Sequence, residues 1–244
     1  MNTIAPSNEV SPADRLQELQ ETVSATRLNC WLQCRLKFYF RYVLRLRKPS
    51  TASLHVGSIV HAVLQAWNRA RWKREPFRVE KFRTVFDSEW QLHQKVEPVQ
   101  WGGEEEEERK GAWVLLETYF AETPIKADEK PEAVEVPVEA DLAMHGLPVL
   151  VGIIDLVRAG GRIVDFKTAA QTPGERTSHL HELQTTSYAV LYRECAGHRE
   201  SGIELHHLVK MKKPKIIVTP LEPMTEWQQN GPSTARNNGG FGHQ

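Results

Sequence analysis

The sequence has few cysteines, no excess of charge of either sign and no long hydrophobic run. Three cysteines in 244 residues are too few for a disulfide framework, and Cys30 and Cys34 lack the second cysteine pair that a zinc site needs. No apolar run approaches the length of a membrane span, and the N-terminus has no apolar signal core. Basic and acidic residues balance at 31 each, so net charge indicates no partner. We expect a cytoplasmic chain without a membrane partner, long enough for one domain with its own core.

Local charge is uneven, in contrast to the net charge. The segment 27–48 contains seven basic residues and no acidic one, with aromatic side chains interleaved. Such a segment can follow a phosphate backbone while its aromatic side chains stack on bases. The alternative is a helix whose aromatic side chains are core and whose charges are the solvated rim. Helical spacing favours the core for four residues, which are Trp31, Leu32, Phe40 and Val43. The candidates for contact with nucleic-acid phosphates are Arg27, Arg41 and Arg45.

Hydrophobic periodicity predicts helices in the first half of the chain and mostly strands in the second. The expected helices cover residues 25–46, 53–72, 78–95 and 104–121, and a later one covers 176–195. The expected strands cover residues 134–140, 149–158, 162–167, 203–211 and 215–218. This order predicts an α/β core behind an N-terminal helical region. We expect residues 1–22 to be a flexible arm. We expect residues 223–244, which are rich in Gly, Asn and Ser from Asn230 onward, to be a disordered or truncated tail.

Two strands of the predicted core carry charges where a buried strand normally has none. Asp155, Asp165 and Lys167 lie in apolar runs, and buried charges are costly unless they are paired or bind a metal. A three-residue loop at 159–161, with Gly161 in the left-handed position, would pair Arg158 with Arg162. That register brings the two carboxylates opposite each other and puts Lys167 on the same face. A two-residue turn would instead place the two carboxylates on opposite faces of the sheet. The other alternative is that Asp155 and Asp165 form ordinary ion pairs. We expect a divalent cation that activates water against a phosphodiester.

Several short motifs around these strands resemble a known family. Gly152-x-x-Asp155 followed by Asp165-Phe-Lys167-Thr168 is similar to the core of the PD-(D/E)XK nuclease superfamily. Gly57-Ser-x-x-His61 and Gln184-x-x-x-Tyr188 resemble its RecB-like branch, as do Ser24-Ala-Thr-Arg27-Leu and Cys34-x-x-Lys37-Phe-Tyr-Phe-Arg41. The resemblance covers residues 23–222 and implies a nuclease domain with a restriction-endonuclease-like α-β-β-β-α-β core and a mixed central sheet. Each motif is weak alone, but their order and spacing together are specific.

The resemblance also implies roles for individual residues. His61, Asp155, Asp165 and the Phe166 backbone carbonyl would bind Mg²⁺ or Mn²⁺, since oxygen-rich sites suit both cations and an imidazole favours Mn²⁺. Lys167 would orient or deprotonate the attacking water, or stabilise the developing charge. The pair Gln184 and Tyr188, spaced i and i+4 on one helical face, would look toward the DNA backbone and the active site.

Other interpretations of these residues stay open. His61 alone is typical of a helix histidine with satisfied hydrogen bonds, and the i, i+4 pair is also typical of a polar, half-exposed helix face. The close approach that Gly57 permits favours a site role for His61. Glu135, in the first strand, could touch the site through a water, but the alternating pattern favours a solvated strand face.

The function that we expect is a metal-dependent DNA nuclease, acting as an exonuclease in repair, recombination or defence. DNA with free ends would be its partner, together with a helicase or repair protein. Many members of the branch bind an iron–sulfur cluster, but no cysteine follows Cys195, so we expect none here. The alternative functions are a catalytically impaired DNA-binding module that recruits partners, and a metalloprotein that acts on something other than DNA.

Overall fold

A mixed six-stranded sheet forms the centre of the computed structural model, which describes residues 11–46, 48–174 and 181–225. The strand order is β1-β5-β6-β7-β8, and β4 pairs with β5 outside this path. β5 is antiparallel to β4 and β6, whereas β6 and β7 run parallel. The strands are β1 (Thr22–Val23), β4 (Ala133–Ala140), β5 (Val149–Arg158), β6 (Arg162–Ala169), β7 (Gly202–Val209) and β8 (Lys215–Leu221).

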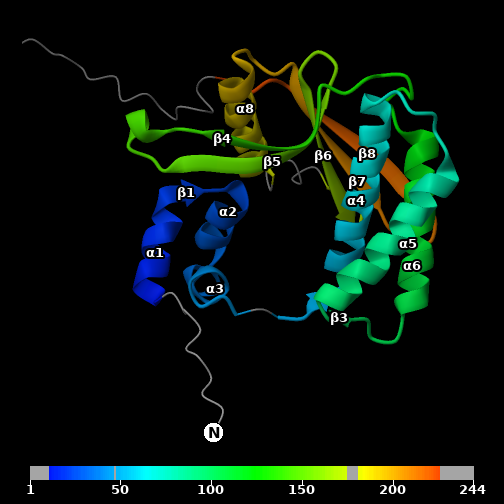
Figure 1. Cartoon of the computed structure of the whole chain (residues 1–244), viewed down its shortest axis with the longest axis horizontal. Coiled ribbons are helices and arrows are strands. Elements are labelled where there is room, and N and C mark those ends of the chain that lie inside the picture. The colour runs from blue at the N-terminus through cyan, green and yellow to red at the C-terminus, as the bar shows by residue number, and fades with distance from the viewer. Residues whose placement is uncertain (1–10, 47, 175–180, 226–244) are drawn as a thin grey trace, which may run out of the picture.

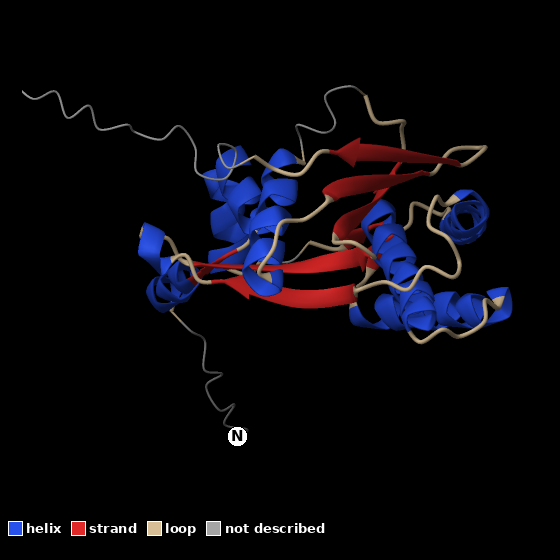
Figure 2. Cartoon of the chain, turned by 90° about the horizontal axis from the view of Figure 1, so that it is seen from above, coloured by secondary structure: helices blue, strands red, loops and turns tan. Residues whose placement is uncertain are grey.

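Helices cover both faces of this sheet, so that two cores form (Figures 1 and 2). The first core packs Leu156, Val164 and Phe166 against α4 (Ala52–Trp72), α5 (Val79–Val96) and α6 (Glu105–Glu122). The second core packs Leu150 and Ile163 against α8 (Glu182–Ala196). The core elements α4, β4, β5, β6, α8 and β7 follow in this order, with α5, β3 and α6 inserted between α4 and β4. They confirm the predicted α-β-β-β-α-β core and its mixed sheet. No described helix has the length and apolarity to cross a membrane.

The N-terminal region lies apart from α5 and α6, beneath β4 and β5 in Figure 1. It contains α1 (Pro12–Glu21), α2 (Ala25–Gln33), α3 (Arg35–Phe38) and a π-helix (Tyr39–Val43). The prediction of one helix over 25–46 was therefore wrong, because Cys34 has extended backbone angles, φ −162° and ψ 107°, and caps α3. Shorter elements are β2 (Ser50–Thr51), β3 (Val99–Gln100) and a 3₁₀ turn (Ala143–His145). Most of the predicted tail lies outside the described residues.

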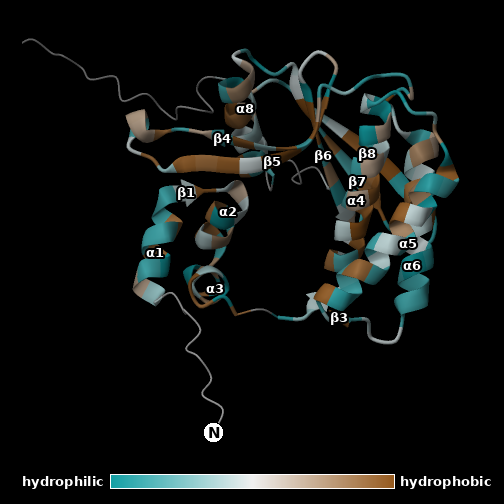
Figure 3. Ribbon diagram, in the orientation of Figure 1, coloured by the Kyte–Doolittle hydropathy of each residue, from teal (hydrophilic) through white to brown (hydrophobic). Residues whose placement is uncertain are grey.

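The break at Cys34 changes which side chains of this region are buried. Val43 is buried as predicted, but Trp31, Leu32 and Phe40 are 41%, 68% and 43% exposed, so the prediction that these three are core was wrong. Continuous helical spacing no longer holds across the break, and the apolar stripe is divided between α2, α3 and the π-helix. Figure 3 shows hydrophobic residues on α2 and α3, where the ribbon is brown. These elements therefore present an apolar and basic surface.

The loop between β5 and β6 has the predicted three-residue form. Arg158 pairs with Arg162, and Gly160 and Gly161 both have positive φ, 81° and 73°. A Cβ on Gly161 would lie 2.5 Å from the Tyr192 hydroxyl oxygen, whereas a Cβ on Gly160 would meet no atom within 4 Å. The left-handed backbone and the close approach of Tyr192 together explain the glycine at 161.

We expect Gly161→Ala to lower the free energy of unfolding by about 1–3 kcal/mol through backbone strain alone, with a further loss because Tyr192 must move. Gly160→Ala is the matched control, since it has the backbone cost without the clash. Chemical denaturation of both variants measures the difference. Equal losses would show that the contact with Tyr192 does not matter.

Candidate active site and metal centre

The candidate site lies where β5 and β6 separate. Their ladder joins Arg158 to Arg162 and ends with the pair Leu156 and Val164. Beyond that pair the Asp155 carboxylate replaces a backbone partner, because its Oδ2 accepts a hydrogen bond of 2.9 Å from the Phe166 backbone N–H. The register places Asp155 opposite Asp165, as the sequence predicted.

Helix α4 contributes His61 from the side of the first core. His61 Nδ1 lies 3.6 Å from Asp155 Oδ2, and its ring is 6.2 Å from the Phe166 ring. Gly57, one turn earlier, allows this approach, because a Cβ there would lie only 3.0 Å from the Thr168 hydroxyl on β6. The sequence predicted the close approach of another backbone at this glycine, and the atom that approaches it is a side-chain hydroxyl.

Lys167 joins β6 to helix α8 through a chain of polar contacts. Its Nζ lies 2.7 Å from Asp165 Oδ2 and donates a hydrogen bond of 2.7 Å to Gln184 Oε1. Gln184 Nε2 in turn donates to the Tyr188 hydroxyl at 2.8 Å. The contact with Asp165 is close enough for an ion pair, but its angles are not those of a hydrogen bond. The i, i+4 pair on α8 therefore reaches the site through Lys167.

Glu135 is the site residue to which the sequence gave too little weight. Its carboxylate, the Asp155 carboxylate and the His61 imidazole each offer a ligand atom within 4.8 Å of the others. The alternating pattern of β4 favoured a solvated face for Glu135, but its backbone has φ 49°. This left-handed residue is invisible to an alternation pattern, and it turns the carboxylate toward His61.

Burial perturbs the acids on this side of the sheet. Desolvation by burial, opposed by His61 and reinforced by the nearby Asp165 charge, raises the pKa of Asp155 to about 6. Desolvation also raises the pKa of Glu135 and of the Tyr188 hydroxyl. Two acids whose charged forms are disfavoured by burial therefore lie side by side, and a cation between them would favour their ionised forms.

The side chains fit a divalent cation. An imidazole and two carboxylates converge at His61, Glu135 and Asp155, which is a donor set that divalent metals accept. Asp165 is 1% exposed, and its Oδ2 is paired with the Lys167 ammonium at 2.7 Å. The site thus contains ligands for a cation and an amine beside them.

The three arginines proposed for nucleic-acid contact lie in α2, the π-helix and the turn after it. Arg27 is half-buried and donates a hydrogen bond of 2.7 Å to the Thr22 hydroxyl, and desolvation lowers its pKa. Arg41 is exposed, with its guanidinium 5.4 Å from the centre of the Tyr42 ring. Arg45 is exposed and has φ 52°. Arg41 and Arg45 are therefore exposed to solvent, whereas Arg27 is hydrogen-bonded within the fold.

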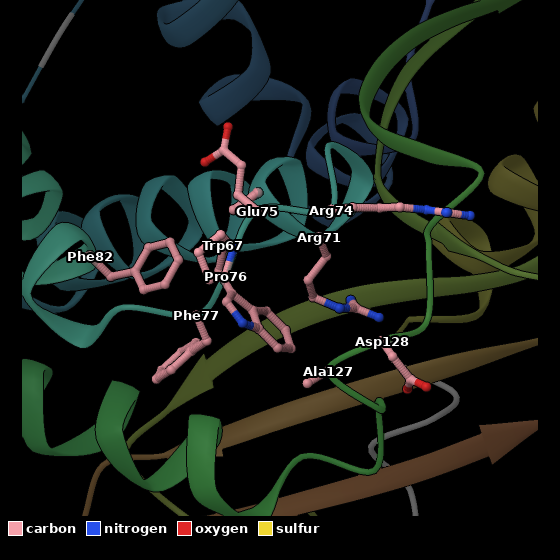
Figure 4. A pocket seen from close by; sticks show the side chains of 10 residues that line it. Trp67, Arg71, Arg74, Glu75, Pro76, Phe77, Phe82, Ala127 and Asp128 are labelled. Carbon is pink, nitrogen blue, oxygen red and sulfur yellow. The ribbon is translucent and has the colours of Figure 1, made fainter.

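Two pockets differ in their relation to the site. A pocket of about 890 Å³ lies between the start of α2, β4, β5 and α8, and it is lined by Gln184 and Tyr188 together with Ser24, Thr26 and Gly152. A second pocket, of about 470 Å³, lies at the end of α4 and is shown in Figure 4. No predicted site residue lines the second pocket.

Arg71, which lines the second pocket, makes contacts that hold the fold together. Its guanidinium donates to the Asn68 side chain at 2.7 Å and to the Glu129 carbonyl at 2.6 Å, and it lies 4.8 Å from the centre of the Trp67 ring. These contacts fasten the loop before β4 to α4. Of these two pockets, the larger one shares Gln184 and Tyr188 with the polar chain that leads to Lys167.

Comparison with known proteins agrees with this geometry. The sequence model of the PD-(D/E)XK nuclease superfamily matches residues 22–237. The chain belongs to the PD-(D/E)XK nuclease superfamily. Members of this superfamily generally use divalent metals, and the His61, Glu135 and Asp155 cluster is a possible site for one.

A solved structure shares the fold at low sequence identity. It is the crystal structure of a protein named "Putative exonuclease" from Eubacterium rectale, with a TM-score of 0.62 and 13% identity. The match covers 94% of this chain and 81% of the other. No match is found among the curated proteins. The nuclease superfamily implies that the substrate of this chain is a nucleic acid.

Proposed function

We propose that this chain is a metal-dependent DNA nuclease of the RecB-like branch, which removes nucleotides from DNA ends in repair, recombination or defence. One observation carries the proposal, namely that His61 lies 3.6 Å from Asp155 and Lys167 lies 2.7 Å from Asp165 at the point where β5 and β6 separate. These are the residues that the family motifs identify. The name of the Eubacterium rectale protein supports exonuclease activity.

The residues of the site have different roles in the proposed hydrolysis. His61, Asp155, Asp165 and the Phe166 carbonyl would hold Mg²⁺ or Mn²⁺, and the bound cation would lower the pKa of a water and stabilise charge on a phosphate. Lys167 orients the attacking water or stabilises the developing charge. Gln184 holds Lys167 from the other side through its 2.7 Å hydrogen bond, so the amine does not depend on Asp165 alone for its position.

The substrate reaches this site past helix α8. Gln184 and Tyr188 line the 890 Å³ pocket and also connect to Lys167, so a strand in the pocket would pass next to the amine. The basic and apolar surface of α2, α3 and the π-helix offers cations for phosphates and exposed rings for bases. Arg41 and Arg45 are the exposed candidates, and Arg27 helps to fix the start of α2 beside the pocket.

Cleavage of end-labelled DNA with and without Mn²⁺ tests the proposal. We expect linear single- or double-stranded DNA to be shortened only in the presence of the cation, and a circular strand to resist because it has no end. Asp165→Asn is the inactive control, because it keeps the shape of the side chain and removes its charge. Binding of DNA without any metal-dependent product would instead indicate a binding module. Digestion of the circular strand at the same rate would rule out dependence on an end.

A further inference from the structure

Three acidic residues form a row across three adjacent strands. The ladder between β4 and β5 pairs Val134 with Leu156 and Val136 with Ile154, which places Glu135 opposite Asp155. The register of β5 and β6 places Asp155 opposite Asp165. Like charges directly opposite each other in a sheet destabilise it, so a row of three needs compensation.

The backbone of β4 is distorted at Glu135, the one residue of this row that the family motifs do not contain. Val134 packs with the first core, whereas Val138 and Ala140 pack with the second, although all three have even numbers. The strand therefore changes which face its side chains present, and the change falls at Glu135, with φ 49°. Non-glycine residues in this region cost about 1–3 kcal/mol and persist where the surroundings impose them.

No basic group pairs directly with Glu135. Within the part of the chain that the structure describes, its carboxylate has no hydrogen-bond or ion-pair partner, and the basic groups that favour its ionised form from a distance are His61 and Arg69. Lys167 already pairs with Asp165. When ionised, the three carboxylates and this one ammonium leave a formal charge of −2, which one divalent cation matches.

We propose that Glu135 is a direct ligand of the catalytic cation, which it binds together with His61 and Asp155. This inference rests on the proposed function, and it adds an anionic ligand from β4 to the set contributed by α4, β5 and β6. Glu135 thereby raises the affinity of the site for the cation and neutralises part of its charge, while Lys167 remains on the Asp165 side. The distortion of β4 is the local structure that aims the carboxylate at the cation.

Calorimetric titration of the full chain with Mn²⁺ tests this ligand without any measurement of cleavage. We expect Glu135→Gln to weaken Mn²⁺ binding by about tenfold or more, since even residues that only orient metal ligands contribute 10- to 100-fold. Glu139→Gln is the matched control, because Glu139 lies on the same strand and is exposed. This variant should bind Mn²⁺ with the wild-type affinity. Binding of Mn²⁺ by Glu135→Gln with the wild-type affinity would overturn the inference.

A second variant separates loss of the ligand from damage to the strand. Asn tolerates the left-handed region, so Glu135→Asn should fold with β4 intact even if Glu135→Gln does not. We expect weakened Mn²⁺ binding with a cooperative thermal transition retained, and wild-type affinity in this folded variant would again contradict the ligand role. If Asp155→Asn loses Mn²⁺ binding while both Glu135 variants keep it, only the role of Glu135 fails. If the wild-type chain binds no Mn²⁺, the proposed function fails with it.

Discussion

Lys167→Met should reduce the metal-dependent cleavage rate by about 10²–10⁴-fold, which is the usual contribution of a positioned acid or base. The amine is held at 2.7 Å from both Asp165 Oδ2 and Gln184 Oε1, so its position is fixed from two elements before any substrate arrives. Methionine keeps the length of the side chain and removes its charge and donors. Single-turnover cleavage of end-labelled DNA at saturating Mn²⁺ measures the effect.

A structural explanation of the same loss has to be excluded. Removing Lys167 leaves the buried Asp165 without its counter-charge, which alone destabilises the fold. Lys210→Met is a matched control, because Lys210, which directly follows β7, also forms an ion pair, with Glu108 on α6. We expect this control to cleave within about threefold of wild type. A Lys167→Met variant that keeps more than a tenth of the wild-type rate would refute the catalytic role of the amine.

Asp155→Asn should stabilise the metal-free protein at neutral pH and at the same time abolish its stabilisation by Mn²⁺. Burial raises the folded-state pKa of Asp155 from 3.8 to about 6, so this carboxyl stabilises the fold fully below about pH 4, and that contribution is lost as pH rises through 6. Above that pH the ionised group costs on the order of 3 kcal/mol. Asparagine avoids the charge and can still accept the hydrogen bond from the Phe166 N–H.

Thermal unfolding in EDTA and in Mn²⁺, at pH 5 and pH 7.5, measures both effects. In EDTA at pH 7.5 the variant should melt several degrees above the wild type, since about 1 kcal/mol moves the Tm by about 2–4 °C in a chain of this size. The difference should shrink at pH 5. Mn²⁺ should raise the Tm of the wild type at pH 7.5 and leave that of the variant unchanged. An equal response of both proteins to Mn²⁺ would contradict a ligand role for Asp155.

The sequence predicted the hairpin of β5 and β6 well because the residues that determine its register are neighbours in the chain. The loop length and Gly161 set the register of β5 and β6, and that register alone brings Asp155 opposite Asp165. The helix that carries His61 and the one that carries Gln184 also follow from hydrophobic spacing. Each of these features depends on a few neighbouring residues whose conformations are strongly restricted.

The residues that the sequence misjudged depend on backbone conformation or on distant packing. Cys34 and Glu135 both leave the regular geometry of their element, and nothing in their side chains requires it. The break at Cys34 exposes Trp31 and Phe40, which hydrophobicity alone assigns to a core. The position of Glu135 could have been found from the register of β4 against β5, since the ladder partners on either side place it opposite Asp155.

Diffraction from crystals grown with Mn²⁺ tests most directly whether one divalent cation organises these side chains. An anomalous difference map should contain a peak within coordination distance of His61 and Asp155, with Lys167 beside it and not bound to it. A map with no peak there, or with His61 and Asp155 turned away from a common ion, would remove the basis for metal-dependent hydrolysis by this chain.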